Sequence, residues 1–305
     1  MRVTTQLAAV ILVLIAAATE ALSNVLQHKA ASSSNRSGNG SQRAGEAAAV
    51  LRTLKKPMFL LGFLLMAIGY GFHVASLGIG NLSIIQVIFV TQLVFILPFS
   101  HWVSRVHIAA GDWLGAAIAT IGIATFVTFA KPSKGADNAT TSQWIISIAI
   151  ISLLCLIVIV AGYRTSGTAR ALLIGCSGGL INGLVAPLTK GTLYKLNGGL
   201  GAMFSSWLLY VTIISVLLGV LFPLMAFRAG PITASFPAVI SLNPIVATIL
   251  GIYLFGETLE SGLVNVIAIA VAAIAMFVGI MWLSRSQAIA RAFEETAPEP
   301  VKPSP

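Results

Sequence analysis

The feature that most constrains this chain is a series of long apolar segments separated by short polar ones. A helix needs about 20 apolar residues to cross the hydrocarbon core of a bilayer. Nine segments of about that length can be placed, at 6–28, 57–78, 82–101, 112–130, 144–163, 171–190, 203–226, 231–254 and 262–283. Only 9% of the 305 residues are charged and 57% are hydrophobic, which is unlike soluble domains. The sequence therefore predicts an all-α membrane protein with nine transmembrane helices in a single domain, 1–285.

Two polar stretches fall outside these segments. The stretch 29–56 is rich in Ser, Gly, Asn and Arg, and it predicts a flexible loop. The stretch 286–305 ends in TAPEPVKPSP and predicts a disordered tail.

The distribution of basic residues predicts the orientation of the chain. The loop 29–56 holds six of the 18 Lys and Arg residues, and short loops rich in these residues face the cytoplasm. With nine spans, 13 basic residues then lie inside and five outside, and Lys190 and Glu257 both fall on the outer side. We expect a multi-pass protein of the plasma (inner) membrane, with its N-terminus outside and its C-terminus in the cytoplasm.

A polar stripe runs along the first apolar segment. Glu20, Ser23, Asn24, Gln27 and His28 fall at i, i+3, i+4, i+7 and i+8, which is one face of a helix. A charge at the centre of a bilayer costs at least roughly 2.5 kcal/mol unless it faces a protein interior or a water-filled cavity. This segment also resembles a secretory signal peptide, but cleavage would destroy the stripe. We therefore expect Glu20 to face a cavity with Asn24 and Gln27.

Glu20 is the only acid deep in any predicted span, so we expect it to bind a proton and a cation in turn. His73, in the second span, is the candidate partner or proton relay. Other mid-span polar residues are expected to line the same cavity from the second, third, sixth and eighth spans: Tyr70, Gln86, Gln92, Asn182 and Asn243. The alternative for each is an interhelical hydrogen bond, worth about 0.6 kcal/mol on average.

Gly and Pro residues mark candidate hinges in two spans. The sixth holds Gly179 and Gly183, whose spacing lets helices approach closely, followed by Pro187; the eighth holds Pro237 and Pro244. A proline frees a backbone carbonyl within the helix, which gives either a hinge or a static kink.

Two similar runs indicate an internal repeat. GNLSIIQVIFVTQL begins at Gly80 and GPITASFPAVISLN begins at Gly230, and each opens a span that carries mid-membrane polar groups. Each of these spans is third in a set of four, with the fifth predicted span between the sets. An odd linker helix inverts the second set relative to the first, which is an architecture of many secondary transporters.

Several function classes lack their motifs. The sequence has no phosphate-binding Gly-rich loop, no metal-ligand spacing of Cys or His, and no nucleophile and base at a recognisable spacing. We expect no enzyme activity, no cofactor and no bound metal. The net charge of +9 is explained by the loops, so the bilayer and not nucleic acid is the expected partner of a monomer or homodimer.

At these residues the chain resembles the drug/metabolite transporter superfamily, in its EamA-like form. NPIVATILGIYLFGE, 243–257, and GDWLGAAIATIG, 111–122, are similar to helices of that superfamily. ATEALSNVLQHKA, 18–30, resembles the first helix of small multidrug resistance proteins, whose membrane glutamate binds protons and cations in turn; Glu20 takes that position. Nine spans and a long basic loop are more similar to NIPA-type magnesium transporters, and PFSHW replaces the Gly-Glu ending in the first half.

The resemblance implies a secondary transporter that moves a small metabolite or organic cation by alternating access, in exchange for protons through Glu20. Two alternatives stay open. One is a NIPA-like transporter of a divalent cation such as Mg²⁺, although Mg²⁺ is usually bound through one or two carboxylates and several waters. The other is a membrane scaffold or accessory subunit that transports nothing.

Overall fold

The structure is a computed structural model that describes residues 2–35, 57–105, 108–130, 139–229, 232–259 and 262–283. All regular secondary structure in these ranges is helical, and eight helices are long and apolar enough to cross a membrane. The prediction of an all-α, multi-pass membrane protein is therefore confirmed. The predicted tail 286–305 and most of the predicted loop lie outside the described residues.

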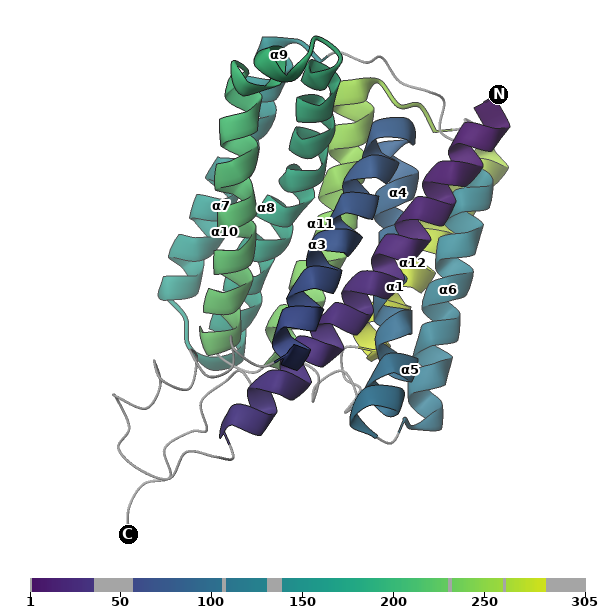
Figure 1. Cartoon of the computed structure of the whole chain (residues 1–305), viewed down its shortest axis with the longest axis vertical. Helices are drawn as coiled ribbons and strands as arrows, with labels where there is room; N and C mark the ends of the chain where they lie inside the picture. Colours follow the sequence, from purple (N-terminus) through teal and green to yellow (C-terminus); the bar gives the residue numbers. More distant parts are fainter. Residues whose placement is uncertain are drawn as a thin grey trace.

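The chain runs down and up the molecule in turn, starting from the N-terminus at the top of Figure 1, with α4 and α5 following one another in the same direction and the short α9 at the upper end. In chain order they are α1 (Arg2–Asn35), α3 (Pro57–Ile79), α4 (Leu82–Phe89), α5 (Gln92–Ser104), α6 (Ala110–Ala130), α7 (Thr141–Tyr163), α8 (Gly167–Leu196), α9 (Leu200–Phe204), α10 (Trp207–Ala229), α11 (Ile232–Phe255) and α12 (Leu263–Leu283).

One helix boundary differs from the sequence prediction, and one predicted span is left undecided. α1 continues to Asn35, so the first loop begins later than residue 29. α10 contains most of the seventh predicted span, which began at residue 203, but its apolar part, Trp207–Pro223, is shorter than the other eight spans. The count of nine spans therefore stays a prediction.

The third predicted span is not one continuous helix. α4 ends at Phe89 and α5 begins at Gln92. At the junction the Val90 and Thr91 amides donate to carbonyls three residues back, and the Thr91 hydroxyl donates to the Ile88 carbonyl at 2.7 Å. These short-range bonds replace the regular α-helical pattern with a short 3₁₀-like turn, within the single candidate membrane span Leu82–Val103.

Two groups of helices pack around a shared centre. α1 packs along α3, α4 and α5, and α8 packs along α7, α10 and α11. α6 and α12 pack together, with α6 beside α4 and α5, while α3, α4 and α11 lie between the two sides of the molecule (Figure 1). Contacts between the groups run mainly from α4 to α11 and from α3 to α8.

Glycines permit the closest of these packings. A Cβ on Gly179 would lie 2.7 Å from the Leu242 Cβ, and one on Gly183 would lie 2.5 Å from the Val246 Cβ. Both glycines of the predicted hinge thus lie where α8 touches α11. The predicted hinge prolines lie inside the same two helices, at Pro187 in α8 and at Pro237 and Pro244 in α11.

Candidate functional site

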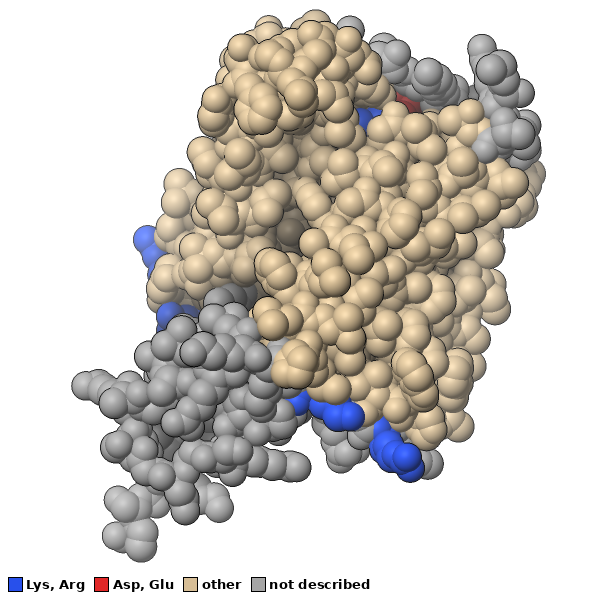
Figure 2. Space-filling model, viewed as in Figure 1, with Lys and Arg blue, Asp and Glu red and all other residues tan. Residues whose placement is uncertain are grey.

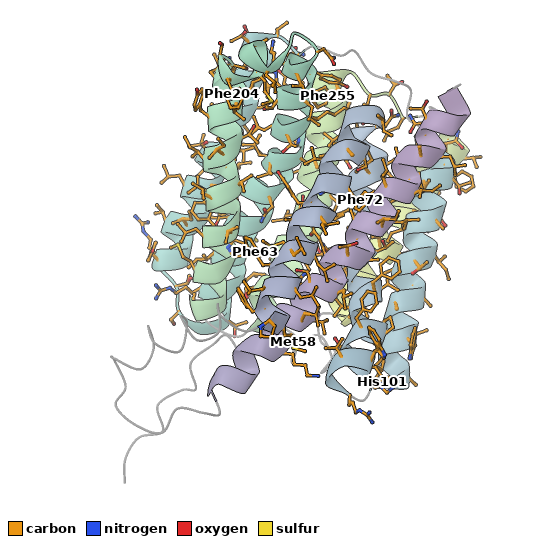
Figure 3. All side chains as sticks on the ribbon, viewed as in Figure 1. Met58, Phe63, Phe72, His101, Phe204 and Phe255 are labelled. Atoms are coloured by element: carbon orange, nitrogen blue, oxygen red, sulfur yellow. The ribbon has the colours of Figure 1, made fainter. Side chains whose placement is uncertain are left out.

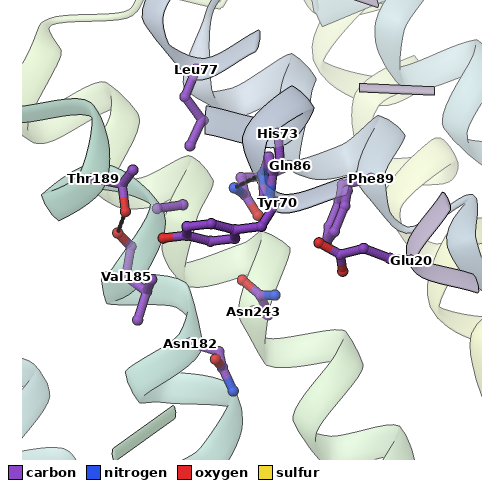
Figure 4. A pocket seen from close by; sticks show the side chains of 11 residues that line it. Glu20, Tyr70, His73, Leu77, Gln86, Phe89, Asn182, Val185, Thr189 and Asn243 are labelled. Carbon is purple, nitrogen blue, oxygen red and sulfur yellow. Dashed lines mark hydrogen bonds between the residues drawn. The ribbon is translucent and has the colours of Figure 1, made fainter. Parts of the chain in front are cut away.

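A cavity of about 150 Å³ lies between the two groups of helices. Figure 2 shows the surface hollowed between α10 and α3. The cavity is lined from α1, α3, α4, α8 and α11, which carry the first, second, third, sixth and eighth predicted spans. Its polar lining residues, most of which Figure 4 shows converging on one space, are Glu20, Tyr70, His73, Gln86, Asn182, Thr189 and Asn243.

Among the described residues, Glu20 is the only charged one that lines this cavity. No described residue donates a hydrogen bond to its carboxylate or forms an ion pair with it. α3 passes close to it at Gly69, where a Cβ would lie 2.9 Å from the Glu20 Cγ. A buried carboxylate needs a compensating partner. A proton, water or a cation that enters the cavity can meet that need.

The close approach of Gly69 to Glu20 gives a first prediction. Gly69→Ala should displace the Glu20 side chain and slow its reaction with a hydrophobic carbodiimide several-fold, as measured by mass spectrometry of the modified peptide. Gly71→Ala is the matched control on the same helix, because a Cβ there meets nothing within 4 Å. Equal rates of Glu20 modification in the two variants would contradict the packing of Glu20 against Gly69.

His73 is held by two neighbours from α4. Its Nε2 lies 3.2 Å from the Gln86 Nε2, and its ring stacks on Phe89 with centroids 4.1 Å apart. An amide nitrogen only donates, so this contact is a hydrogen bond in the tautomer whose Nε2 carries no proton. His73 and Glu20 line the same cavity, but no direct hydrogen bond joins them in the described structure.

Asn182 and Thr189 line the cavity from α8. The Asn182 Nδ2 donates to the Gly178 carbonyl at 3.0 Å and to the Gly219 carbonyl at 2.9 Å, which ties α8 to α10. The Thr189 hydroxyl donates to the Val185 carbonyl at 2.8 Å. A Cβ at Gly219 would lie 2.6 Å from the Asn182 Oδ1, so a larger residue there would displace the Asn182 side chain.

Asn243 lies in the middle of α11, immediately before Pro244. Its Oδ1 is buried and has no hydrogen-bond partner in the described structure. Tyr70 lines the cavity from α3, and its side chain is 41% exposed, so the lining reaches the outer surface of the helix group.

Two residues expected at the cavity, Asn24 and Gln92, are placed elsewhere, and a third, Gln27, is not tested. Asn24 and Gln92 do not line it, and the side chain of Gln27 lies outside the described part of the chain. Asn24 is one helical turn from Glu20, about 6 Å along the axis, and α1 meets the cavity at Glu20 but not at Asn24. Only part of the polar stripe on α1 therefore faces the cavity.

A buried ion pair next to the cavity was not expected from the sequence, which places both charges at the outer surface. The Lys190 Nζ lies 3.1 Å from the Glu257 Oε1, and the two side chains are 5% and 1% exposed. The same Nζ donates to the Gly80 carbonyl at 3.0 Å and lies 4.8 Å from the centroid of the Phe255 ring. Phe255 marks this place near the upper end of the molecule in Figure 3.

Glu257 also binds the first turn of α4. Its carboxylate accepts hydrogen bonds from the Leu82 amide at 2.6 Å, the Ser83 amide at 3.0 Å and the Ser83 hydroxyl at 2.6 Å. Amides at the start of a helix lack helical partners and favour a negative charge. The pair thus joins α8 and the end of α11 to the start of α4, across the two groups.

The described ranges contain no group of three or more His, Cys, Asp or Glu residues placed to hold a metal ion. Cys155 and Cys176 are free thiols there, and the Cys155 thiol donates to the Ser177 carbonyl at 3.7 Å.

No family model and no solved structure matches the chain. The chain is similar to an uncharacterized protein of Corynebacterium glutamicum, with 27% identity over 285 residues. The alignment covers 92% of this chain and 96% of that protein, so the likeness extends over nearly the whole length of both.

Proposed function

We propose that this protein is a secondary transporter that moves a small organic cation or metabolite across the membrane by alternating access, in exchange for protons. One observation carries the proposal: the cavity between the two helix groups contains a single carboxylate, Glu20, which has no partner among the described residues. Intramembrane ionisable groups of this kind mark substrate or proton pathways.

The cavity gives a simple basis for coupling. Because Glu20 is the only charged group that lines it, a proton and a cationic substrate compete for the same carboxylate. Binding of the cation then releases the proton, and rebinding of the proton releases the cation. Exchange follows when the cavity opens to each side of the membrane in turn.

The packing supports the proposal of two inverted sets. α1 packs along α3 and along α4 and α5, and α8, which runs in the opposite direction, packs in the same way along α10 and α11. α6 and α12 pack on each other, and α7 is the linker between the sets. With α10 counted as a ninth span, each of the two proposed sets has four spans.

Matching lysines add to this correspondence. Lys29, near the end of α1, donates to the Val103 carbonyl near the end of α5. Lys190, near the end of α8, binds Glu257 just beyond the end of α11. Glu20 lies nine residues before Lys29 and Asn182 eight before Lys190, so Asn182 lies within one residue of the place equivalent to Glu20, and the proposed transporter has one carboxylate where a symmetric one has two.

We propose the plasma (inner) membrane as the location, with the lower end of Figure 1 in the cytoplasm. The exposed basic residues of the described chain lie mainly at that end (Figure 2), among them Arg105 and Arg164. At the upper end Lys190 is buried in its ion pair and Lys195 is exposed. The bias agrees with the positive-inside rule.

Transport in liposomes tests the proposed function. Purified protein is reconstituted with a pH-sensitive dye inside, and monoamines, diamines, quaternary ammonium ions or Mg²⁺ are added outside acid-loaded vesicles. We expect an organic cation to accelerate the loss of internal protons well above the rate in protein-free vesicles. No acceleration with any of the cations would contradict the proposal and favour a scaffold, whereas acceleration by Mg²⁺ alone would favour a divalent-cation transporter.

A further inference from the structure

The polar side chains of the cavity direct many of their hydrogen-bond donors to the protein itself. Both amide hydrogens of Asn182 are used on the carbonyls of Gly178 and Gly219. The Thr189 hydroxyl donates to its own helix, and the Gln86 amide is turned toward the His73 Nε2. Asn182 and Thr189 therefore have no donor left for a ligand.

Hydrogen-bond acceptors remain at the same place. The Asn243 Oδ1 is buried without a partner in the described structure, although buried polar atoms are nearly always hydrogen-bonded. The Thr189 oxygen keeps lone pairs after its hydroxyl has donated. The Glu20 carboxylate adds the strongest acceptor of the cavity. The Asn243 Nδ2 and the Tyr70 hydroxyl remain as donors, but the charge of Glu20 favours a ligand that carries positive charge and donates hydrogen bonds.

The rest of the lining limits the size and polarity of that ligand. Leu77, Phe89 and Val185 supply apolar contacts. A cavity of about 150 Å³ has the volume that accepts a single aromatic ring. The nearby cation, Lys190, is bound to Glu257 and does not line the cavity.

We infer that the cavity selects primary ammonium ions that carry a small apolar or aromatic group, and that Asn243 provides this selectivity. The inference rests on the proposed function and specifies the substrate class of the same site. A primary ammonium ion has three N–H groups to share between Glu20 and Asn243. A quaternary ammonium ion has the same charge but no N–H group, so it pairs with Glu20 and leaves the Asn243 oxygen unpartnered.

Calorimetric binding to the purified full-length protein tests the inference. The probes are benzylamine and phenethylamine, each compared with its N-trimethylated derivative at one pH. We expect the primary amines to bind the wild-type protein about tenfold or more tightly, because hydrogen bonds to charged groups are stronger than neutral ones. Asn243→Leu should bring the ratio of the two affinities close to one, because both ions carry the same charge. Asn243→Asp keeps an acceptor of the same shape and should preserve the preference for the primary amine.

The wild-type comparison keeps the inference falsifiable even if Asn243→Leu does not fold. Equal affinity for both members of each pair, or binding of neither, would overturn the inference. Equal affinity accompanied by cation-driven proton flux in liposomes would leave the proposed function intact. Failure of the proposed function would give a different result, because no cation tested would then drive proton flux in liposomes.

Discussion

Replacing Glu20 by Gln is expected to abolish proton-coupled flux while the protein stays folded. The amide fills nearly the same volume against Gly69 but neither takes up nor releases a proton at ordinary pH. The effect should be complete, because no other acid lines the cavity. The measurement is cation-driven proton flux in liposomes, with equal incorporation of wild-type and variant protein.

Glu20→Asp is the matched control for that variant. It keeps a titratable carboxyl group but retracts it by one methylene group, so we expect reduced flux with a changed pH dependence. Elution of both variants as single symmetrical peaks in detergent shows that the fold is retained. Full proton-coupled flux in a folded Glu20→Gln protein would remove Glu20 from the mechanism.

Replacing Lys190 by Met is expected to cause the largest loss of stability among charge-removing substitutions. It leaves the Glu257 carboxylate, which is 1% exposed, without its cation. Breaking a buried ion pair by removing one partner costs roughly 3 to 5 kcal/mol. The fall in thermal unfolding temperature in detergent, followed by thiol-reactive fluorescence or by loss of the monodisperse peak, measures this cost.

Two further variants separate the loss of the pair from the loss of a lysine. Lys195→Met removes an exposed charge from the same helix and should change stability by no more than about 0.5 kcal/mol. The double variant Lys190→Met with Glu257→Gln should recover much of the loss, because a neutral amide needs no counter-charge. If Lys190→Met and Lys195→Met unfold at the same temperature, the buried pair does not hold the two helix groups together.

The membrane helices were predictable because the bilayer imposes one strong length requirement on each apolar segment. The residues of the cavity were partly predictable for a related reason. Polar side chains in the middle of apolar helices must face one another or water, and Glu20, Gln86, Asn182 and Asn243 meet in one cavity. Asn24 shares the stripe of Glu20, but the extent of a cavity along a helix depends on the neighbouring helices.

The turn between α4 and α5 had no strong sequence signal. Val90 and Thr91 are neither Gly nor Pro, and the Thr91 hydroxyl that bonds the Ile88 carbonyl is common in regular helices as well. The pair of Lys190 and Glu257 was missed for a different reason. Charges at the ends of spans are assigned to the surface by the positive-inside rule, and the burial of residues 67 positions apart depends on tertiary packing.

The central claim is that a proton and a cation compete for Glu20. Proton release on ligand binding tests this claim most directly. Phenethylamine is added to purified protein in weakly buffered, mildly acidic detergent solution, and the released protons are counted against the ligand bound. We expect the wild-type protein to release protons as phenethylamine binds, and the Glu20→Gln variant to release none. Binding of phenethylamine to the wild-type protein without proton release, or equal release by the Glu20→Gln variant at equal occupancy, would contradict the account.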